Sequence, residues 1–285
     1  MTDTDTDTDT VERVGNSLIQ HGPLNDRIYL MKFGQAEAPE LISSLDELAD
    51  EKGYTKIFAK VPTDAKPLFK ENGYRQEAEI PGFFEGVRAA HFLAKYRSEE
   101  RSRATETETI QKIMEIARRK HKTGLSRMGQ GRDGYRLDRA KPSDVSEMSK
   151  VYRGVFETYP FPIHDPRYLL QTMKSHVHYF CARAEGRIVA LSSAEIDRAD
   201  LNVEMTDFAT LPSQLGNGLA ARLLARMEAS MRELGLRTAY TIARALSAGM
   251  NITFSKLGYQ HGGTLTNNTN ISGDIESMNV WYKPL

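Results

Sequence analysis

The sequence predicts an α/β fold in which a mixed sheet is flanked by helices and the chain is built in two similar halves. Short apolar strands alternate with amphipathic helices along most of the chain, which is typical of a layered α/β domain. In addition, FKENGY at Phe69 to Tyr74 is matched by FSKLGY at Phe254 to Tyr259, and the same order of strands and helices precedes each. We interpret the first half as a partial, degenerate copy of the second; the alternative is that a helix ending in Gly-Tyr is simply common.

The first half, residues 11–97, contains two strand-and-helix units. An apolar strand at residues 28–31 is followed by a segment whose apolar side chains share one helical face and which ends at Gly53. A second strand, KIFAKVP, ends at Pro62, and the helix after it ends at Gly73. One or two further strands complete this half.

Two polar segments lie outside the halves. Residues 1–10, MTDTDTDTDT, are polar and self-repelling, so we expect a disordered tail. Residues 98–134 are rich in charge and then in glycine, and we interpret them as a linker that contains one helix.

The second half, residues 135–285, has the more regular pattern. A strand from Tyr135 leads to a helix that begins near Pro142, and a loop rich in proline and aromatic residues follows. Two strands flank Glu185-Gly186 as a hairpin, and VEMTDFATL forms a third strand. A long helix begins near Gly216, and a strand, a short helix and a last strand complete the domain.

Composition narrows the classes of function. The 285 residues carry 38 basic and 38 acidic side chains, so no overall field favours nucleic acid or an anionic membrane surface. A single cysteine excludes an intrachain disulfide and a multi-cysteine metal site, and we expect no metal. The sequence has neither a secretory signal nor an apolar run approaching about 18 residues. We therefore expect a cytoplasmic protein that binds neither nucleic acid nor membrane.

The segment LPSQLGNGLA, where a strand gives way to the long helix, is the main candidate for ligand binding. Alternating glycines let backbone N–H groups converge in front of a helix N-terminus, an arrangement that binds pyrophosphate. Alone this is weak evidence, because any turn that needs a positive φ uses glycine. A dinucleotide fingerprint would need a third glycine at Ala221, and a P-loop would need Gly-Lys-Ser/Thr; both are absent.

The strand, glycine loop, helix, strand and Leu-Gly-Tyr helix resemble the GCN5-related N-acetyltransferase family over residues 135–285. The resemblance implies a GNAT-like fold with acetyl-CoA as co-substrate. Gly218 and Ala220 fit the fixed loop positions, whereas Leu215 stands where the family usually has Arg or Gln. Phe254 replaces the tyrosine that usually protonates the CoA thiolate. The residues implied to contact CoA are Phe208, Ala209, Thr210, Gln214, Leu215, Gly216, Asn217, Gly218, Leu219, Ala220, Asn251 and Phe254.

Three further segments resemble the β-lysine N-acetyltransferases of osmolyte synthesis: GGTLTNNTNISGDIESMNVWYK, AGMNITFSKLGY and FETYPFPIHDPRYL. This resemblance implies a small-molecule amine acceptor, the terminal (N6) amine of β-lysine, and a product that serves as a compatible solute under salt stress. Two alternatives remain open: acetylation of protein lysines or other amines, and a non-catalytic acyl-CoA-binding sensor.

The catalytic candidates are Glu204 and Asp207. An alkyl ammonium has a pKa near about 10, so a base must remove its proton before the amine attacks. Alternation along a strand predicts that Glu204 and Thr206 face one side and Asp207 the other. A backbone N–H at Phe208 or Ala209 would polarise the thioester carbonyl, as in the family. The alternative is that both carboxylates are ordinary polar residues.

An acceptor that carries two amines and a carboxylate needs a polar pocket. The candidate substrate-binding residues are Glu157, Tyr159, His164, Asp165, Arg167 and Asn268. The first half has no glycine loop after Met31-Lys32-Phe33, so we expect it not to bind CoA, and either to pack against the second half or to complete a homodimer.

Overall fold

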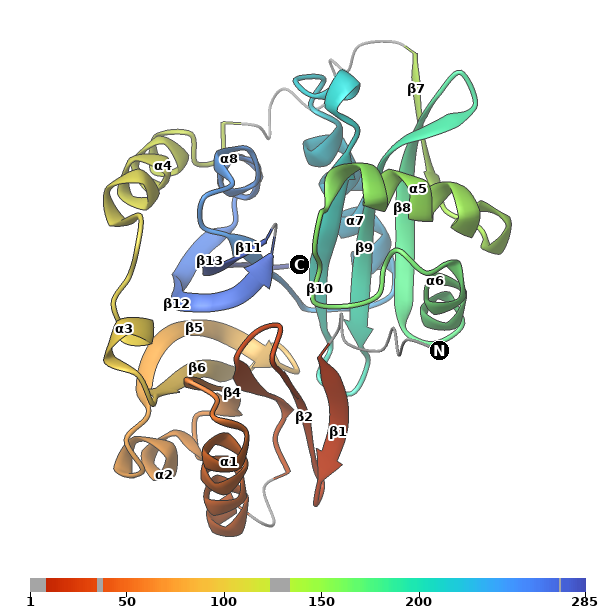
Figure 1. The fold of residues 1–285 in the computed structure, drawn as a ribbon. Coiled ribbons are helices and arrows are strands. Elements are labelled where there is room, and N and C mark those ends of the chain that lie inside the picture. Colours follow the sequence, from red (N-terminus) through yellow and green to blue (C-terminus); the bar gives the residue numbers. More distant parts are fainter. Residues whose placement is uncertain (1–8, 35–37, 124–133, 272) are drawn as a thin grey trace.

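The computed structural model describes residues 9–34, 38–123, 134–271 and 273–285. In these residues the chain forms one continuous mixed sheet, with helices packed along its outside (Figure 1). The expected α/β architecture is confirmed. No helix in the described ranges has the length and apolar character needed to cross a membrane.

The first half begins with a hairpin that the sequence analysis did not anticipate. Its strands are β1 (Thr10–Val14), β2 (Ser17–Gly22), β3 (Arg27–Lys32), β4 (Lys56–Pro62), β5 (Arg75–Phe84) and β6 (Arg88–Tyr96), and its helices are α1 (Ala38–Lys52) and α2 (Lys66–Glu71). Asp9 is buried and accepts hydrogen bonds from Leu24 N at 3.2 Å and Asn25 Nδ2 at 2.5 Å. The expected disordered tail is therefore wrong at residues 9–10; residues 1–8 lie outside the described ranges.

The segment between the halves contains two helices rather than one. These are α3 (Glu99–Ser102) and α4 (Thr107–Arg119). Met114 and Ala117 of α4 are buried in the core of the second half, and Ser255 Oγ donates to Ala117 O at 2.6 Å. This helix is thus part of the second half's core rather than a free connection, and residues 124–133, with most of the glycine-rich stretch, lie outside the described ranges.

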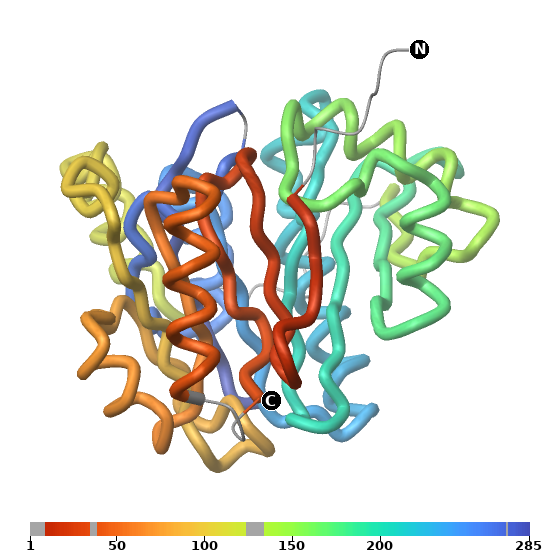
Figure 2. The backbone as a smooth tube through the Cα atoms, turned by 60° about the horizontal axis from the view of Figure 1, so that its bottom comes forward, coloured from red at the N-terminus to blue at the C-terminus, as the bar shows by residue number. Residues whose placement is uncertain are grey.

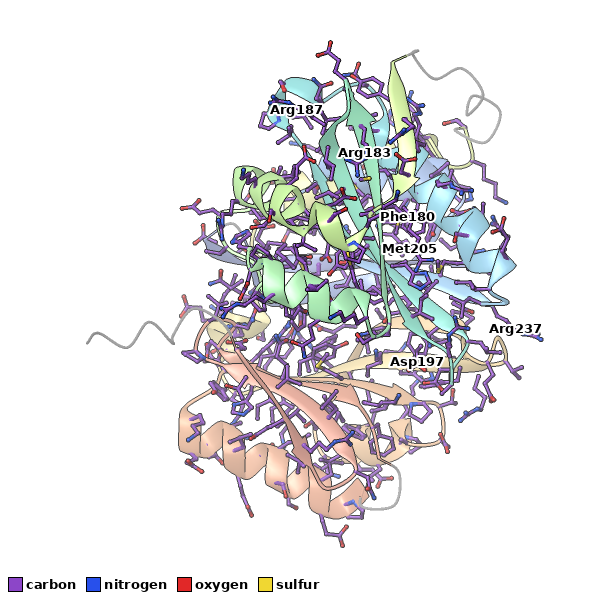
Figure 3. All side chains as sticks on the ribbon, turned by 90° about the vertical axis from the view of Figure 1, so that its right-hand side faces the viewer. Phe180, Arg183, Arg187, Asp197, Met205 and Arg237 are labelled. Carbon is purple, nitrogen blue, oxygen red and sulfur yellow. The ribbon has the colours of Figure 1, made fainter. Side chains whose placement is uncertain are left out.

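The second half follows the predicted order. Its strands are β7 (Tyr135–Arg139), β8 (Val177–Ala184), β9 (Arg187–Asp197), β10 (Asn202–Thr210), β11 (Thr238–Arg244), β12 (Gln260–Ile271) and β13 (Asp274–Pro284). Its helices are α5 (Val145–Val155), α6 (Pro166–Met173), α7 (Leu219–Glu233) and α8 (Ala248–Lys256), with 3₁₀ turns at Pro142–Asp144 and Pro212–Gln214. Phe180 and Met205 lie in the core under α7 (Figure 3).

The sheet order supports the interpretation of the halves as copies. It runs β1-β2-β3-β4-β6-β5-β12-β13-β11-β10-β9-β8-β7. Counted outward from the β5/β12 junction, the order β5-β6-β4-β3-β2-β1 of the first half is matched by β12-β13-β11-β10-β9-β8 in the second. The pairs β3/β4 and β10/β11 are parallel, and their neighbours are antiparallel. The matched motifs also pack alike: the Phe69 and Tyr74 rings lie 5.0 Å apart at 76°, and those of Phe254 and Tyr259 lie 5.0 Å apart at 72°.

The two halves meet where β5 pairs with β12, and two consecutive glycines make this approach possible. A Cβ on Gly262 would lie 2.5 Å from Glu79 O, and one on Gly263 would lie 2.1 Å from Glu77 O. Both distances are far below van der Waals contact, so a side chain at either position would push the strands apart.

The sheet curves so that the inner faces of the two halves pack against each other through a shared core. Phe58 and Phe83 of the first half pack here with Tyr240 and Met278 of the second. In the view of Figure 2 the red strands of the first half lie in front of the sheet of the second half, with its blue strands to one side and its cyan strands to the other. Hydrogen bonds cross the gap, from Gln20 Nε2 to Pro160 O at 3.2 Å among others. The inner face of the first half therefore helps to enclose the space beside β10.

Candidate active site

A cavity of about 730 Å³ lies between the two inner faces. Sequence-predicted residues that line it are Tyr159, Glu204, Asp207, Phe208, Thr210, Gln214, Leu215, Gly216, Gly218, Leu219, Ala220, Phe254 and Asn268. The first half contributes a second wall that the sequence analysis missed, formed by Gln20, Arg27, Tyr29, Met31, Phe58 and Lys60 among others. The two halves therefore build one site together.

The glycine loop has the backbone geometry that the sequence predicted. Gly216 has φ +81° and Gly218 has φ +69°, and both lie in the left-handed region that favours glycine. Gly218 caps the 15-residue helix α7, whose N-terminus points into the cavity beside these glycines. The Tyr135 hydroxyl donates to Gln214 Oε1 at 2.6 Å and fixes the side chain beside the exposed Leu215. Such an N-terminus favours an anionic group.

A β-bulge in β10 corrects the expectation about Asp207. The register passes from Thr206 opposite Ser193 to Ala209 opposite Leu191, which leaves one extra residue in β10, and Asp207 has φ +53°. Ser193 Oγ donates to Asp207 Oδ2 at 2.5 Å, and the Tyr159 hydroxyl donates to Oδ1. Asp207 thus lines the same cavity as Glu204 instead of facing away, because a bulge interrupts the alternation of side chains.

Three carboxyl groups gather on this face of the sheet. Glu195 stands directly opposite Glu204 in the β9/β10 register, and Asp207 follows beyond the bulge. Burial raises the pKa of Glu204, and the nearby Asp207 adds to the effect, whereas Lys60 and a hydrogen bond from Tyr240 oppose it. Burial and the charges of Glu204 and Asp207 raise the pKa of Glu195 well above its ordinary value. A cluster of carboxyl groups with raised pKa values has the chemistry to accept a proton near neutral pH and to pair with an ammonium group.

Lys60 of β4 faces this acidic cluster from the first half. Its Nζ lies 5.1 Å from the Phe83 ring centroid and 5.7 Å from that of Tyr240. Burial lowers the pKa of Lys60, but Tyr29 and Glu204 outweigh burial and leave this pKa raised. The sequence did carry a signal: the otherwise apolar strand KIFAKVP contains two lysines at positions that share one face.

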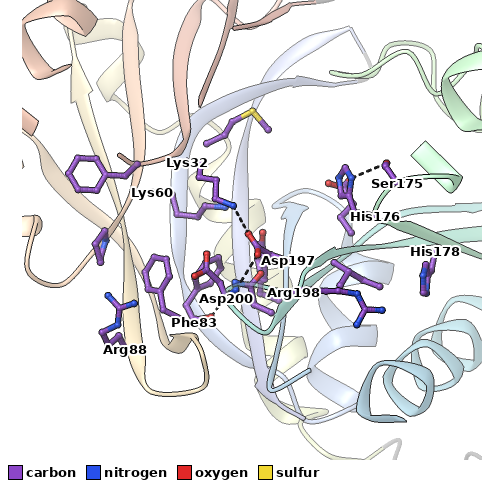
Figure 4. Close-up of a pocket in the computed structure, with 18 residues that line it drawn as sticks. Lys32, Lys60, Phe83, Arg88, Ser175, His176, His178, Asp197, Arg198 and Asp200 are labelled. Carbon is purple, nitrogen blue, oxygen red and sulfur yellow. Dashed lines mark hydrogen bonds and ion pairs between the residues drawn. The ribbon is translucent and has the colours of Figure 1, made fainter. Parts of the chain in front are cut away.

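A second cavity of about 730 Å³ adjoins the first. Lys60, Glu195 and Tyr240 line both cavities. Figure 4 shows its mouth, where Lys32 Nζ donates to Asp197 Oδ2 at 3.1 Å and joins the halves. The acidic cluster thus lies where the two cavities adjoin.

Asn251, expected to contact CoA, has a structural role instead. Its side chain is fully buried, and Nδ2 donates to Arg244 O at 2.9 Å while Oδ1 accepts from Asn279 Nδ2 at 2.8 Å and Trp281 Nε1 at 2.9 Å. These bonds tie α8 to β11 and β13. The residue does not line the cavity, so the expectation is corrected: a helical asparagine gave no sequence signal of its buried partners.

Several other candidates also lie away from the cavity. Asp165 caps α6 by accepting from Arg167 N at 2.8 Å, and the Arg167 side chain is 92% exposed. The carbonyl of His164 accepts from Ser149 Oγ at 2.6 Å. Residues predicted to bind ligands but absent from the cavity wall are Glu157, His164, Asp165, Arg167, Ala209 and Asn217. The Pro-rich loop presents its aromatic side chains to the cavity and its charged ones elsewhere.

Phe254 lies in the cavity wall at the end nearest the glycine loop. Its ring packs edge-on against Phe208, with centroids 5.7 Å apart at 88°. The side chain is buried and carries no proton to donate. The hydroxyl-bearing residues Thr241, Ser247 and Thr253 also line the cavity.

Comparison with known proteins gives matches over nearly the whole chain. The acetyltransferase (GNAT) family matches residues 146–259. The β-lysine N(6)-acetyltransferase of Methanococcus maripaludis is 42% identical over 270 residues, covering 95% of this chain and 97% of the relative. That of Methanosarcina mazei is 33% identical over 86% and 97%, and the N-acetyltransferase YodP of Bacillus subtilis is 30% identical over 94% and 96%. The similarity includes both halves.

Proposed function

Since the chain belongs to the GNAT family of acetyltransferases and is an acetyl-CoA-dependent N-acetyltransferase, we propose that its acceptor is the N6 amine of β-lysine, 3,6-diaminohexanoate. The observation that carries the proposal is the 42% identity over 95% of the chain to a relative named for this reaction. The cavity supports it, because the carboxyl groups of Glu195, Glu204 and Asp207 line a space that is large enough for a small amine.

Glu204 is the proposed base. The carboxylate takes one proton from the N6 ammonium, and the neutral amine then attacks the carbonyl carbon of the acetyl thioester. Its raised pKa brings this carboxyl group nearer to the pH at which a general base works best. Asp207 is the second candidate, but two hydroxyl groups already occupy its oxygens, so we assign it the role of holding the acidic cluster in place.

The remaining steps use the glycine loop. Backbone N–H groups of Gly216 and Gly218 would hold the CoA pyrophosphate, and the N–H of Phe208, beside the β10 bulge and in the cavity wall, would polarise the thioester carbonyl. The carbon–sulfur bond then breaks, the attacking nitrogen loses its second proton to become the neutral amide, and the departing thiolate takes up a proton. Because Phe254 has no hydroxyl group, we propose that a neighbouring hydroxyl or water supplies this proton.

The product would be Nε-acetyl-β-lysine, whose acetylated end is uncharged. The molecule retains one carboxylate and one ammonium and is therefore neutral overall, as a compatible solute under salt stress needs to be. We place the reaction in the cytoplasm, because a chain whose single cysteine is Cys181 has no intrachain disulfide and fits a reducing compartment.

The test is thiol release from acetyl-CoA with β-lysine, α-lysine and a lysine-containing peptide as acceptors. Strong preference for β-lysine supports the proposal, whereas turnover of the peptide alone would assign the enzyme to protein modification. Phe254 and Leu215 depart from the family pattern and favour a second candidate, an acyl-CoA sensor. Binding of acetyl-CoA without release on any amine would support that candidate.

A further inference from the structure

Two residues of the cavity wall each have one buried side-chain atom with no hydrogen-bond partner among the described residues. One is Nε of Arg27, a residue of β3 that is 4% exposed. The other is Oδ1 of Asn268, a residue of β12 that is 1% exposed. Both residues line the cavity. Because native proteins rarely bury a donor or an acceptor unpaired, these two atoms indicate a ligand that completes their bonding.

Arg27 and Asn268 are held next to each other. Nη1 of Arg27 donates to the backbone carbonyl of Asn268 and, at 3.0 Å, to Thr269 Oγ1. These bonds fix the guanidinium across the junction of the halves while Nε stays unpaired. Burial lowers the pKa of Arg27 to about 10, so the side chain is still a cation at neutral pH.

The chemistry of the two atoms specifies the ligand group. A guanidinium N–H pairs best with a carboxylate, and a buried amide oxygen pairs with a donor such as an ammonium. A ligand that carries a carboxylate beside an ammonium therefore satisfies both atoms with charge-assisted hydrogen bonds. The C1 carboxylate and C3 amine of 3,6-diaminohexanoate form such a group.

Tyr29 links this place to the acidic cluster. Arg27 and Tyr29 lie two residues apart on one face of β3, a rise of about 7 Å, and Arg27 Cζ is 5.4 Å from the Tyr29 ring centroid. On its other side Tyr29 hydrogen-bonds to Lys60, and burial and the nearby charge of Glu204 raise the pKa of the Tyr29 hydroxyl. A short methylene chain beside Tyr29 can therefore join the two ends.

We propose that Arg27 and Asn268 form the subsite for the amino acid head group of the acceptor. Arg27 Nε donates to the carboxylate, and Asn268 Oδ1 accepts from the C3 ammonium, which leaves the N6 amine at Glu204. This inference rests on the proposed function. The first half of the chain then determines which amine the second half acetylates.

The experiment uses three acceptors that differ by one group. β-Lysine carries both head-group charges, 6-aminohexanoate lacks the C3 amine, and 1,4-diaminopentane lacks the carboxylate. In the wild-type enzyme we expect kcat/KM for 1,4-diaminopentane to be roughly 100-fold below that for β-lysine, because the buried guanidinium is then left unpaired. Equal values for the two acceptors would overturn the proposal without any variant.

Two variants assign the charges to residues. Arg27→Gln should lower kcat/KM about 100-fold for β-lysine and 6-aminohexanoate, and less than about threefold for 1,4-diaminopentane. Asn268→Ala should cost about tenfold for the two diamines and leave 6-aminohexanoate unchanged. A uniform loss on all three acceptors would overturn the assignment.

Arg101→Gln is the matched control. Arg101 is 7% exposed at the same junction, and its Nε donates to Asn267 O at 2.8 Å, but it does not line the cavity. We expect it to lower the melting temperature without changing the ranking of the three acceptors. If it changes that ranking as Arg27→Gln does, the effect is structural and the subsite is wrong.

The two proposals fail in different ways. If the wild-type enzyme does not acetylate β-lysine, the proposed function falls and the subsite falls with it. If it acetylates β-lysine and Arg27→Gln does so equally well, with acetyl-CoA affinity unchanged in both, only the subsite is overturned.

Discussion

The two halves share one strand arrangement but put different chemistry on it. In the second half, β10 leads through residues 211–218 to α7, and this connection contains the two glycines with positive φ. In the first half, β3 leads to α1 through the shorter connection 33–37, which has no Gly-x-Gly pair. The matching Phe and Tyr pairs, by contrast, pack alike in both. The first half thus has the same aromatic packing as the second and lacks its glycine loop.

The inner faces differ in charge. In the parallel pair β3/β4, Tyr29 stands opposite Phe58, and in the matching pair β10/β11, Glu204 stands opposite Tyr240. Glu204 therefore occupies the position in the second half that Tyr29 occupies in the first. The first half contributes the cations Arg27 and Lys60 to the cavity wall, whereas the second half contributes three carboxyl groups and one cation, Arg244. The faces are therefore complementary, and a molecule with both charges fits between them. The comparison teaches that a half without a glycine loop can still form one wall of the shared cavity.

The largest expected effect is on acetyl-CoA binding, which we assign to the β10–α7 connection and not to the β3–α1 connection. Gly218→Trp should weaken acetyl-CoA binding by more than about 100-fold, because the indole fills the space before α7 and the residue must adopt φ +69°. Gly186→Trp is the control: Gly186 has φ +81° in the β8/β9 turn, a Cβ there would meet nothing within 4 Å, and the residue does not line the cavity. Calorimetry measures both, and equal affinities would remove the loop from CoA binding.

A change in the base comes next. Glu204→Gln keeps the shape of the side chain and removes its proton affinity, so kcat should fall by roughly 100-fold or more while acetyl-CoA affinity stays the same. Steady-state rates and a binding titration measure the two quantities. A rate within about twofold of wild type would exclude Glu204 as the base.

Lys60→Met tests whether Lys60 of the first half lowers the pKa of Glu204 in the second half. Burial raises the pKa of Glu204 and Lys60 lowers it, so removing the ammonium raises this pKa further. The base is then protonated over a wider range, and the acidic limb of the kcat/KM profile should move to higher pH, with a loss of several-fold on that limb. Lys95→Met, which breaks an outer pair with Asp46, is the control. An unmoved limb would contradict the coupling.

The smallest expected effect is on stability and concerns the β5/β12 junction of the two halves. Gly262→Ala places a Cβ 2.5 Å from Glu79 O and should cost about 1–3 kcal/mol of unfolding free energy. Gly249→Ala in α8 meets nothing within 4 Å and should be neutral or slightly stabilising. Thermal unfolding compares the two. A stable Gly262→Ala variant would show that the β5/β12 approach is looser than described.

The sequence by itself determined the features that depend on local chemistry. The alternation of strands and helices, the glycine loop before α7 and the FKENGY and FSKLGY endings were all readable, because periodicity, positive φ and helix termination are properties of neighbouring residues. The family and its acetyl-CoA chemistry followed from these motifs.

Only the tertiary structure decided how these parts meet. The bulge at Asp207 overrode strand alternation, Asn251 found its partners on distant strands, and Arg27 came to lie beside Asn268. Each depends on pairing between residues far apart in the chain, which no local pattern encodes. The second wall of the cavity follows from the curvature of one continuous sheet, because that curvature brings the first half over the second.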